Sequence, residues 1–202
     1  MVFSERAGFD LAVRLRRGDA VALGEVFAFI SGLYFRGKLA YALEFARPPE
    51  PDTPLVGSGA LVITPTAGLR AAETLITIEA LQAFARVNIA ADDPRYRTPL
   101  TTSARALVEE VGPDCDVVLL GSIASAKYVD ILVEVFGDRL LFPVDFVGRG
   151  DMSRGGLMLR AVRAGEQLPY GPVKGAVRHG RRPPKLAPIT GILKENPWRT
   201  RP

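Results

Sequence analysis

The stretch FVGRGDMSRGGLMLR, residues 146–160, combines glycines with arginines and an aspartate, the residue types of an anion-binding site. Arg149 and Arg154 offer planar, forked donors that suit phosphate or carboxylate. Gly150 allows backbone shapes that other residues resist, and Ser153 adds a hydroxyl. Asp151 is the candidate catalytic residue, as a general acid or base. The alternative is a structural turn in which Asp151 pairs with a neighbouring arginine.

A second candidate is VVLLGSIASAKY, residues 117–128, in which an apolar run leads through Gly121 and Ser122 into a helix that Ser122 is expected to cap. The free N–H groups and positive dipole end of a helix N-terminus can hold a phosphate or carboxylate. Ser125 and Lys127 would add a hydroxyl and a charge about one turn further on. The pattern matches neither a P-loop nor a dinucleotide-binding fingerprint. The alternative is an ordinary strand-to-helix turn with a serine cap.

A third candidate is FISGLYFRGKLAYA, residues 29–42. Ser31 and Gly32 precede a helix whose first turn offers Tyr34, Arg36 and Lys38. An aromatic ring beside cations can stack a base and pair a phosphate. The alternative is an amphipathic helix whose basic residues are simply exposed to solvent.

The elements that must position these stretches alternate between apolar runs and helical patterns. Short continuous apolar runs are typical of strands buried on both faces, which need helices on both sides. We therefore predict an α/β fold with a small parallel Rossmann-like sheet, and a loop at 66–75. The predicted strands are residues 60–65, 116–122 and 139–146, and the predicted helices are residues 34–46, 77–87, 100–112 and 122–137.

Composition narrows the function classes. The chain has 202 residues, of which 48% are hydrophobic and 24% charged, as in ordinary globular proteins. The lone Cys115 excludes an intramolecular disulfide and a multi-cysteine zinc site, and the lone His179 excludes a histidine-rich metal site. We predict no metal and no cofactor. The longest nearly apolar stretch, residues 26–35, is about half of what a bilayer span needs, so a cytoplasmic protein without membrane contact is expected.

Charge divides the chain into two regions. Residues 172–202 carry eight lysines and arginines against one glutamate, whereas the remaining chain carries slightly more acidic than basic side chains. We expect one α/β domain over 1–171, with a helical lead-in over 1–30, and a basic, proline-rich extension over 172–202. Such an extension can bind nucleic acid, or it can be a solvated tail. An oligomer is also possible.

Three segments together resemble a family of uncharacterised bacterial proteins. They are SGLYFRGKLAYALEFA, ALVITPTAGLRAAETLITIEAL and DVVLLGSIASAKYVDILVEVFGDRLLFPVDFVGRG, within residues 29–156. The resemblance implies a Rossmann-like α/β fold and a role connected with nucleotides or nucleic acids. The matching positions are Leu33, Tyr34, Lys38, Tyr41, Gly68, Leu69, Lys127, Tyr128, Val129 and Pro143. The chain departs from the family pattern at Thr64-Pro65, where small residues are usual, and lacks the proline that follows the Gly-Leu pair.

Three functions fit these observations. The first is a metal-independent enzyme acting on a nucleotide, nucleoside or nucleic acid, such as a hydrolase or a glycosidic-bond transferase. In it, Arg149 and Arg154 hold phosphate, Tyr34 stacks a base and Asp151 is the acid or base. Its ligand would be a nucleotide or other phosphorylated small molecule. The second is a non-catalytic nucleic-acid-binding protein that uses residues 172–202. The third is a subunit that binds a protein partner.

Overall fold

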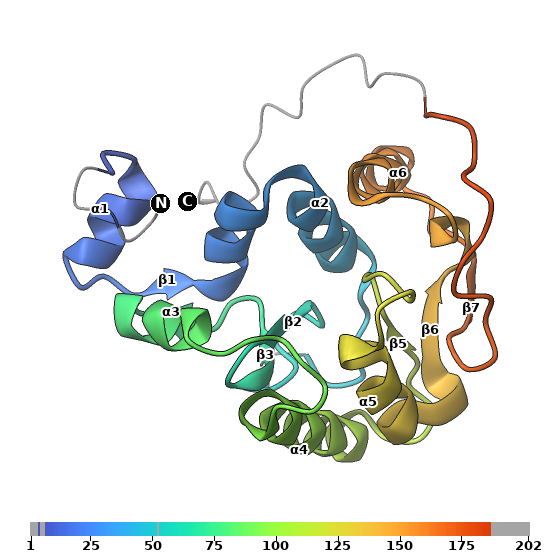
Figure 1. Cartoon of the computed structure of the whole chain (residues 1–202), viewed down its shortest axis with the longest axis horizontal. Coiled ribbons are helices and arrows are strands. Elements are labelled where there is room, and N and C mark those ends of the chain that lie inside the picture. Colours follow the sequence, from blue (N-terminus) through green and yellow to red (C-terminus); the bar gives the residue numbers. More distant parts are fainter. Residues whose placement is uncertain (1–3, 5–6, 52, 187–202) are drawn as a thin grey trace.

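The computed structural model describes residues 4, 7–51 and 53–186, and the chain folds into a mixed α/β structure (Figure 1). The helices are α1 (Asp10–Arg16), α2 (Leu23–Phe45), α3 (Ile78–Ala85), α4 (Pro94–Val111), α5 (Ala126–Phe136) and α6 (Asp151–Ala164), with short 3-10 helices η1 (Gly137–Arg139) and η2 (Val144–Phe146). The strands are β1 (Val21–Ala22), β2 (Leu61–Thr64), β3 (Gly68–Ala71), β4 (Leu75–Ile76), β5 (Val117–Val118), β6 (Leu140–Pro143) and β7 (Tyr170–Pro172).

The strands form three small sheets, and not the one parallel sheet that the sequence led us to expect. β1 pairs with β4 and β2 pairs with β3, both antiparallel. β5 and β6 are parallel, as predicted, and β7 adds to β6 in the antiparallel direction. The run at residues 60–65 forms a strand, but it pairs with β3, which lies in the segment expected to be a loop. A tight turn at residues 65–67 brings the two together, and the buried Thr64 hydroxyl closes this turn by donating to the Gly68 carbonyl at 2.8 Å.

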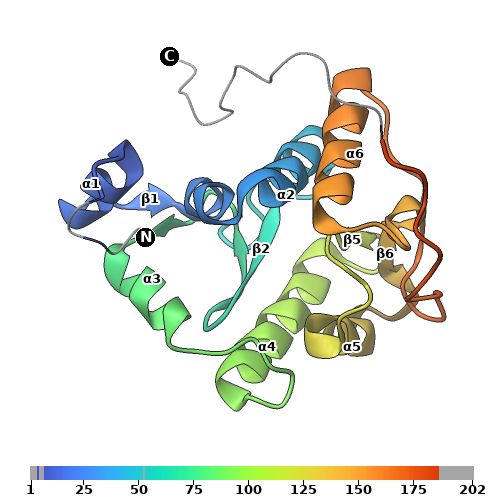
Figure 2. The ribbon, with the colours of Figure 1, turned by 45° about the horizontal axis from the view of Figure 1, so that its top comes forward.

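Helices cover both faces of the three-stranded sheet, as the apolar runs predicted. Leu140 and Phe142 point to one face and join the core formed with α4 and α5. Tyr170 points to the other face, towards the core formed with α2 and α6. Figure 2 shows α5 and α6 on opposite sides of β5 and β6. Because successive side chains of a strand point to opposite faces, β6 and β7 together contribute side chains to both cores.

Helix α2 crosses the centre of the molecule and packs along α6 (Figures 1 and 2). Gly32 interrupts it with φ of 64° and ψ of −145°, which joins two helices across a kink. Beyond the kink, Gly37 and Gly155 allow the two backbones to meet. A Cβ atom added at Gly37 would lie 2.8 Å from the Gly155 carbonyl oxygen, and one added at Gly155 would lie 3.0 Å from Tyr34 Cα. The close contact of α2 with α6 therefore depends on these two glycines.

Several predicted boundaries differ from the structure. The lead-in over residues 1–30 contains strand β1 between α1 and α2. Helix α5 begins at Ala126, so Ser125 is its N-cap residue, not Ser122. Residues 151–164, expected to be a glycine-rich turn, form helix α6. Glycines lower the helix propensity of this segment, but the packing of Gly155 against α2 stabilises the helix.

The first part of the basic extension is packed against the domain. Pro172 belongs to β7, and the Val173 amide donates to the Leu140 carbonyl at 2.8 Å. Further on, the backbone of Arg181 contacts Gly148, and Arg149 Nη1 lies 3.5 Å from the Pro184 carbonyl oxygen. Residues 187–202, which complete the predicted extension, lie outside the described residues. In the described ranges, we find no helix with the length and apolarity that a membrane span requires.

Candidate functional site

The three stretches singled out in the sequence meet at one edge of the sheet. The carboxyl end of β5 continues into Leu120 and Gly121, and the carboxyl end of β6 leads through η2 to the start of α6 at Asp151. Helix α2 completes the arrangement, because the Tyr34 hydroxyl donates a hydrogen bond to the Leu120 carbonyl oxygen at 3.3 Å. This edge, at the carboxyl ends of parallel strands, is where open α/β sheets bind their ligands.

Lys38 is the central charge of this site. It lies one turn after Tyr34 on α2, and its Nζ atom is 4.0 Å from the centre of the Tyr34 ring. Burial lowers the pKa of the Lys38 amine to about 8, because removal from water disfavours the charged form. The charge of Arg154 lowers this pKa further, and the charge of Asp151 opposes both effects. Lys38 thus holds a proton that it can lose near neutral pH.

Arg154 is the second cation of the site, and it is buried. Its Nε donates to the Phe146 carbonyl at 3.3 Å, and its Nη1 lies 3.4 Å from Asp151 Oδ1. The guanidinium carbon lies 5.8 Å from the centre of the Phe146 ring. Burial raises the pKa of the neighbouring Tyr34 hydroxyl to about 12, and the charge of Arg154 acts in the opposite direction.

The charges of the site do not cancel. Lys38 and Arg154 interact electrostatically with each other and with Asp151, whose side chain is 66% exposed. Among the described residues, Arg154 and Asp151 are the two charged groups that act on both Lys38 and Tyr34. Two partly desolvated cations against one solvated carboxylate leave an excess of positive charge, which an anionic ligand would neutralise.

The loop after β5 is shaped by Tyr128. The Tyr128 hydroxyl donates to the Ser122 carbonyl oxygen at 2.8 Å. A Cβ atom at Gly121 would lie 2.9 Å from this hydroxyl, so a larger residue there would displace the ring. Burial raises the pKa of the Tyr128 hydroxyl. Tyr128 therefore fixes the position of the backbone that borders the site.

The structure separates the predicted site residues into two groups. Tyr34, Gly121, Ser122, Asp151 and Arg154 lie together at the sheet edge. The others are peripheral: Ser31, Arg36, Lys127 and Gly150 are exposed, Gly32 forms the kink, Ser125 caps α5 without a side-chain bond, and Arg149 and Ser153 bond to each other.

Two predicted site residues have protein contacts that the sequence did not indicate. Arg149 Nε donates to the Asp145 carbonyl at 2.9 Å, so this arginine supports the turn before α6. Lys38 covers one face of the Tyr34 ring, which makes that face unavailable to a base. Lys38, which the sequence placed beside Tyr34 and Arg36 in the same candidate, is the second cation next to Arg154. Its spacing from Tyr34, four residues along the helix, puts both side chains on one helix face.

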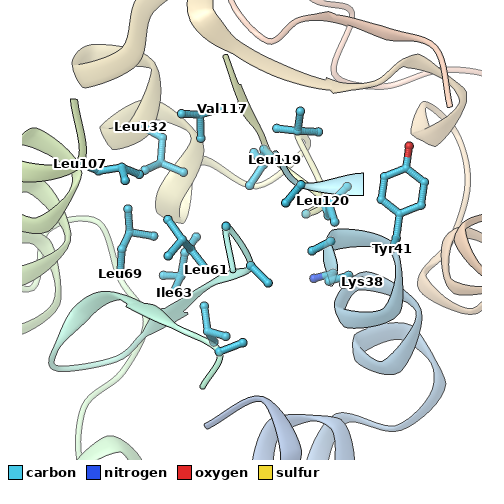
Figure 3. A pocket seen from close by; sticks show the side chains of 18 of the residues that line it. Lys38, Tyr41, Leu61, Ile63, Leu69, Leu107, Val117, Leu119, Leu120 and Leu132 are labelled. Carbon is cyan, nitrogen blue, oxygen red and sulfur yellow. The ribbon is translucent and has the colours of Figure 1, made fainter. Parts of the chain in front are cut away.

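A large apolar cavity lies beside this polar cluster (Figure 3). Its volume is about 670 Å³, and Lys38, Gly121 and Tyr128 belong both to its wall and to the cluster. Figure 3 shows aliphatic side chains facing the cavity from several elements, with Lys38 on the wall formed by α2. The aliphatic wall comprises, among others, Leu61, Ile63, Leu69, Leu107, Leu119 and Leu132.

The cavity opens to solvent, and its volume of about 670 Å³ falls in the range of small-molecule pockets, about 300–1,000 Å³. The wall also carries an unsatisfied group, because the buried Tyr96 hydroxyl has no hydrogen-bond partner among the residues with described positions. The cavity is therefore suited to a ligand.

Within the part of the chain that the structure describes, no group of three or more histidine, cysteine, aspartate or glutamate side chains could hold a metal ion. Comparison with models of protein families, with curated proteins and with solved structures finds no match for this chain.

Proposed function

We propose that this protein is an enzyme that acts on a nucleotide or other phosphorylated small molecule, bound at the carboxyl edge of β5 and β6. The observation that carries the proposal is the pair of partly desolvated cations, Lys38 and Arg154, opposed by the single carboxylate of Asp151. Arginine and lysine are the usual ligands of phosphate. The location supports it too, because open α/β sheets bind their ligands at the carboxyl ends of parallel strands.

Each side chain has a role in this proposal. Lys38 contacts the phosphate, because its amine lies on the cavity wall. Arg154 adds positive potential and holds Asp151 in position through their ion pair. Lys38 and Asp151 are the acid and base that hydrolysis or glycosidic-bond transfer needs. Lys38 suits this role because its pKa of about 8 is near the working pH, where a catalytic group is most effective.

A thermal-shift screen tests this proposal. Adenosine monophosphate and inorganic phosphate at 100 times their Kd should each stabilise the protein by about 2.7 kcal/mol. Lys38→Met should abolish the shift, and Arg36→Met, an exposed cation on the same helix, should retain it. Product formation from nucleotide substrates, followed by chromatography, then tests catalysis. The absence of a shift with every phosphate compound, or an equal loss in both variants, would exclude the site.

The basic extension supports a second candidate, binding of nucleic acid. Arg181, Arg182 and Lys185 are exposed next to each other and border a shallow hollow with two prolines. Phosphate contacts of this kind weaken as salt rises, with log K falling by roughly 0.7–0.9 per contact per log unit of salt. Replacing the three side chains with glutamine should reduce both oligonucleotide affinity and its salt dependence. Binding that is unchanged would exclude this candidate.

A further inference from the structure

The cavity beside Lys38 has a composition that constrains what a ligand can be. Its wall is formed by leucine, isoleucine and valine side chains from β2, β3, α4, β5 and α5, and Figure 3 shows many of them facing the same space. Ligand pockets usually combine apolar walls with a few polar groups that fix orientation. Two cations, Lys38 and Arg47, line the cavity; Arg47 is exposed, whereas Lys38, on the α2 side, is partly buried.

The tyrosine hydroxyls on the wall are largely engaged. The Tyr41 hydroxyl bonds to the Tyr170 hydroxyl and accepts from the Leu168 amide, and the Tyr128 hydroxyl donates to Ser122. A nucleobase placed in this cavity would bury several donors and acceptors, with the Tyr96 hydroxyl as the one unpaired buried group on the described wall. Buried polar groups without partners are strongly unfavourable. An aliphatic chain has no such groups to satisfy.

We infer that the cavity binds the aliphatic chain of a single-chain amphiphile whose anionic head, a phosphate monoester, is held at Lys38. The inference rests on the proposed function, since it uses the same phosphate position, and it specifies the rest of the substrate as an alkyl, acyl or isoprenoid group. The chain lies among Leu61, Leu107, Leu119 and Leu132, and the head lies at the polar cluster with Lys38, Tyr34 and Arg154. A chain in this position displaces water from aliphatic surface, which is favourable.

Calorimetric titration of the full chain with butyl, hexyl and octyl phosphate, below their micellar concentrations, tests the inference. Each added methylene should tighten the Kd by up to about fourfold, so that octyl phosphate binds up to about 250-fold more tightly than butyl phosphate. Adenosine monophosphate and inorganic phosphate are the control ligands, because they carry the phosphate group but no alkyl chain. Lys38→Met should weaken every alkyl phosphate by a similar factor.

A cavity-filling variant separates the chain from the head. Leu61→Trp places an indole in the cavity and should remove the gain with chain length while leaving the binding of inorganic phosphate unchanged. Ile63→Trp fills the cavity from the same face of β2 and replaces the first variant if Leu61→Trp does not fold. Leu75→Trp is the matched control, because Leu75 is 66% exposed and lies outside the cavity wall.

The outcomes distinguish this inference from the proposed function. If phosphate and adenosine monophosphate bind but chain length has no effect, the inference is overturned and the proposed function stands. A gain with chain length that Leu61→Trp and Ile63→Trp do not reduce places the chain elsewhere and overturns the inference. Alkyl phosphates that bind Lys38→Met as tightly as they bind the wild type place the head elsewhere and also overturn it. If no phosphate compound binds, both are overturned.

Discussion

Replacing Lys38 with methionine should stabilise the folded protein at neutral pH. The pKa of this amine falls from its usual value of 10.5 to about 8, mainly because of burial. A tenfold change in a proton affinity corresponds to 1.36 kcal/mol, so the charged amine destabilises the folded state by about 3 kcal/mol at pH 7. The contact of Nζ with the Tyr34 ring offsets about 1 kcal/mol. We therefore expect Lys38→Met to gain about 2 kcal/mol, or about 4–8 °C in Tm.

The stability gained by Lys38→Met should decrease as the pH rises. Between pH 8 and 10.5 the folded amine is neutral while the unfolded one is still protonated, so the unfolded state binds more protons and the wild-type stability rises with pH. Below pH 8 both states are protonated and the destabilisation is fully present. Because methionine does not titrate, the advantage of Lys38→Met should be largest at pH 7 and should vanish near pH 10.

Chemical denaturation of both proteins at pH 7, 8, 9 and 10 measures this difference. Arg36→Met is the control, since Arg36 is exposed on the same helix and its replacement should change stability by less than about 0.5 kcal/mol at every pH. A Lys38→Met variant that is less stable than the wild type at pH 7, or whose difference does not change with pH, would refute the reasoning. In that case Lys38 is not desolvated and cannot be the poised amine of the site.

Three further substitutions test the packing around the site, each by thermal or chemical denaturation. Gly155→Ala forces a Cβ to 3.0 Å from the backbone of α2 and should cost about 1–3 kcal/mol, whereas Gly150→Ala, with nothing within 4 Å, should be nearly neutral. Tyr41→Phe leaves the buried Leu168 amide unpaired and should cost about 1–3 kcal/mol; an unchanged stability would show that water replaces the hydroxyl. Thr64→Val removes both hydrogen bonds of the β2–β3 turn and should cost a similar amount, about 1–3 kcal/mol, and a neutral effect would mean that the hairpin does not need them.

The sequence indicated the parallel pair at the centre of the site. Continuous apolar runs at residues 116–122 and 139–146 predicted two buried strands, and β5 and β6 form in them as parallel neighbours. β6 is largely buried, whereas β5 is shorter than predicted and half-buried. Parallel strands present their carboxyl ends at one edge, so the loop with Gly121 and the stretch with Asp151 were expected to meet there. The local pattern was sufficient to locate both strands, because the apolar residues of each strand are consecutive in the sequence.

The position of residues 60–65 could not be predicted in the same way. The run is as apolar as the other two, and it also forms a strand, but it pairs with β3 in a hairpin. What decides its partner is the turn that the Thr64 hydroxyl closes and the contact of Gly68 with α4, where a Cβ would meet the backbone of Pro99. Periodicity predicts whether a segment is extended, and it carries no information about which strand lies beside it.

The sequence by itself determined which chemistry was available: arginine, aspartate, serine and lysine near glycines, and the lack of enough cysteine and histidine for a metal cluster. Only the tertiary structure decided which of these groups act together. Helix α6 begins at Asp151, and its packing on α2 through Gly37 and Gly155 turns Arg154 inwards, towards Tyr34 and away from Arg149. The physical reason is that desolvation and charge interactions depend on distances across separate elements, which no spacing along the chain specifies.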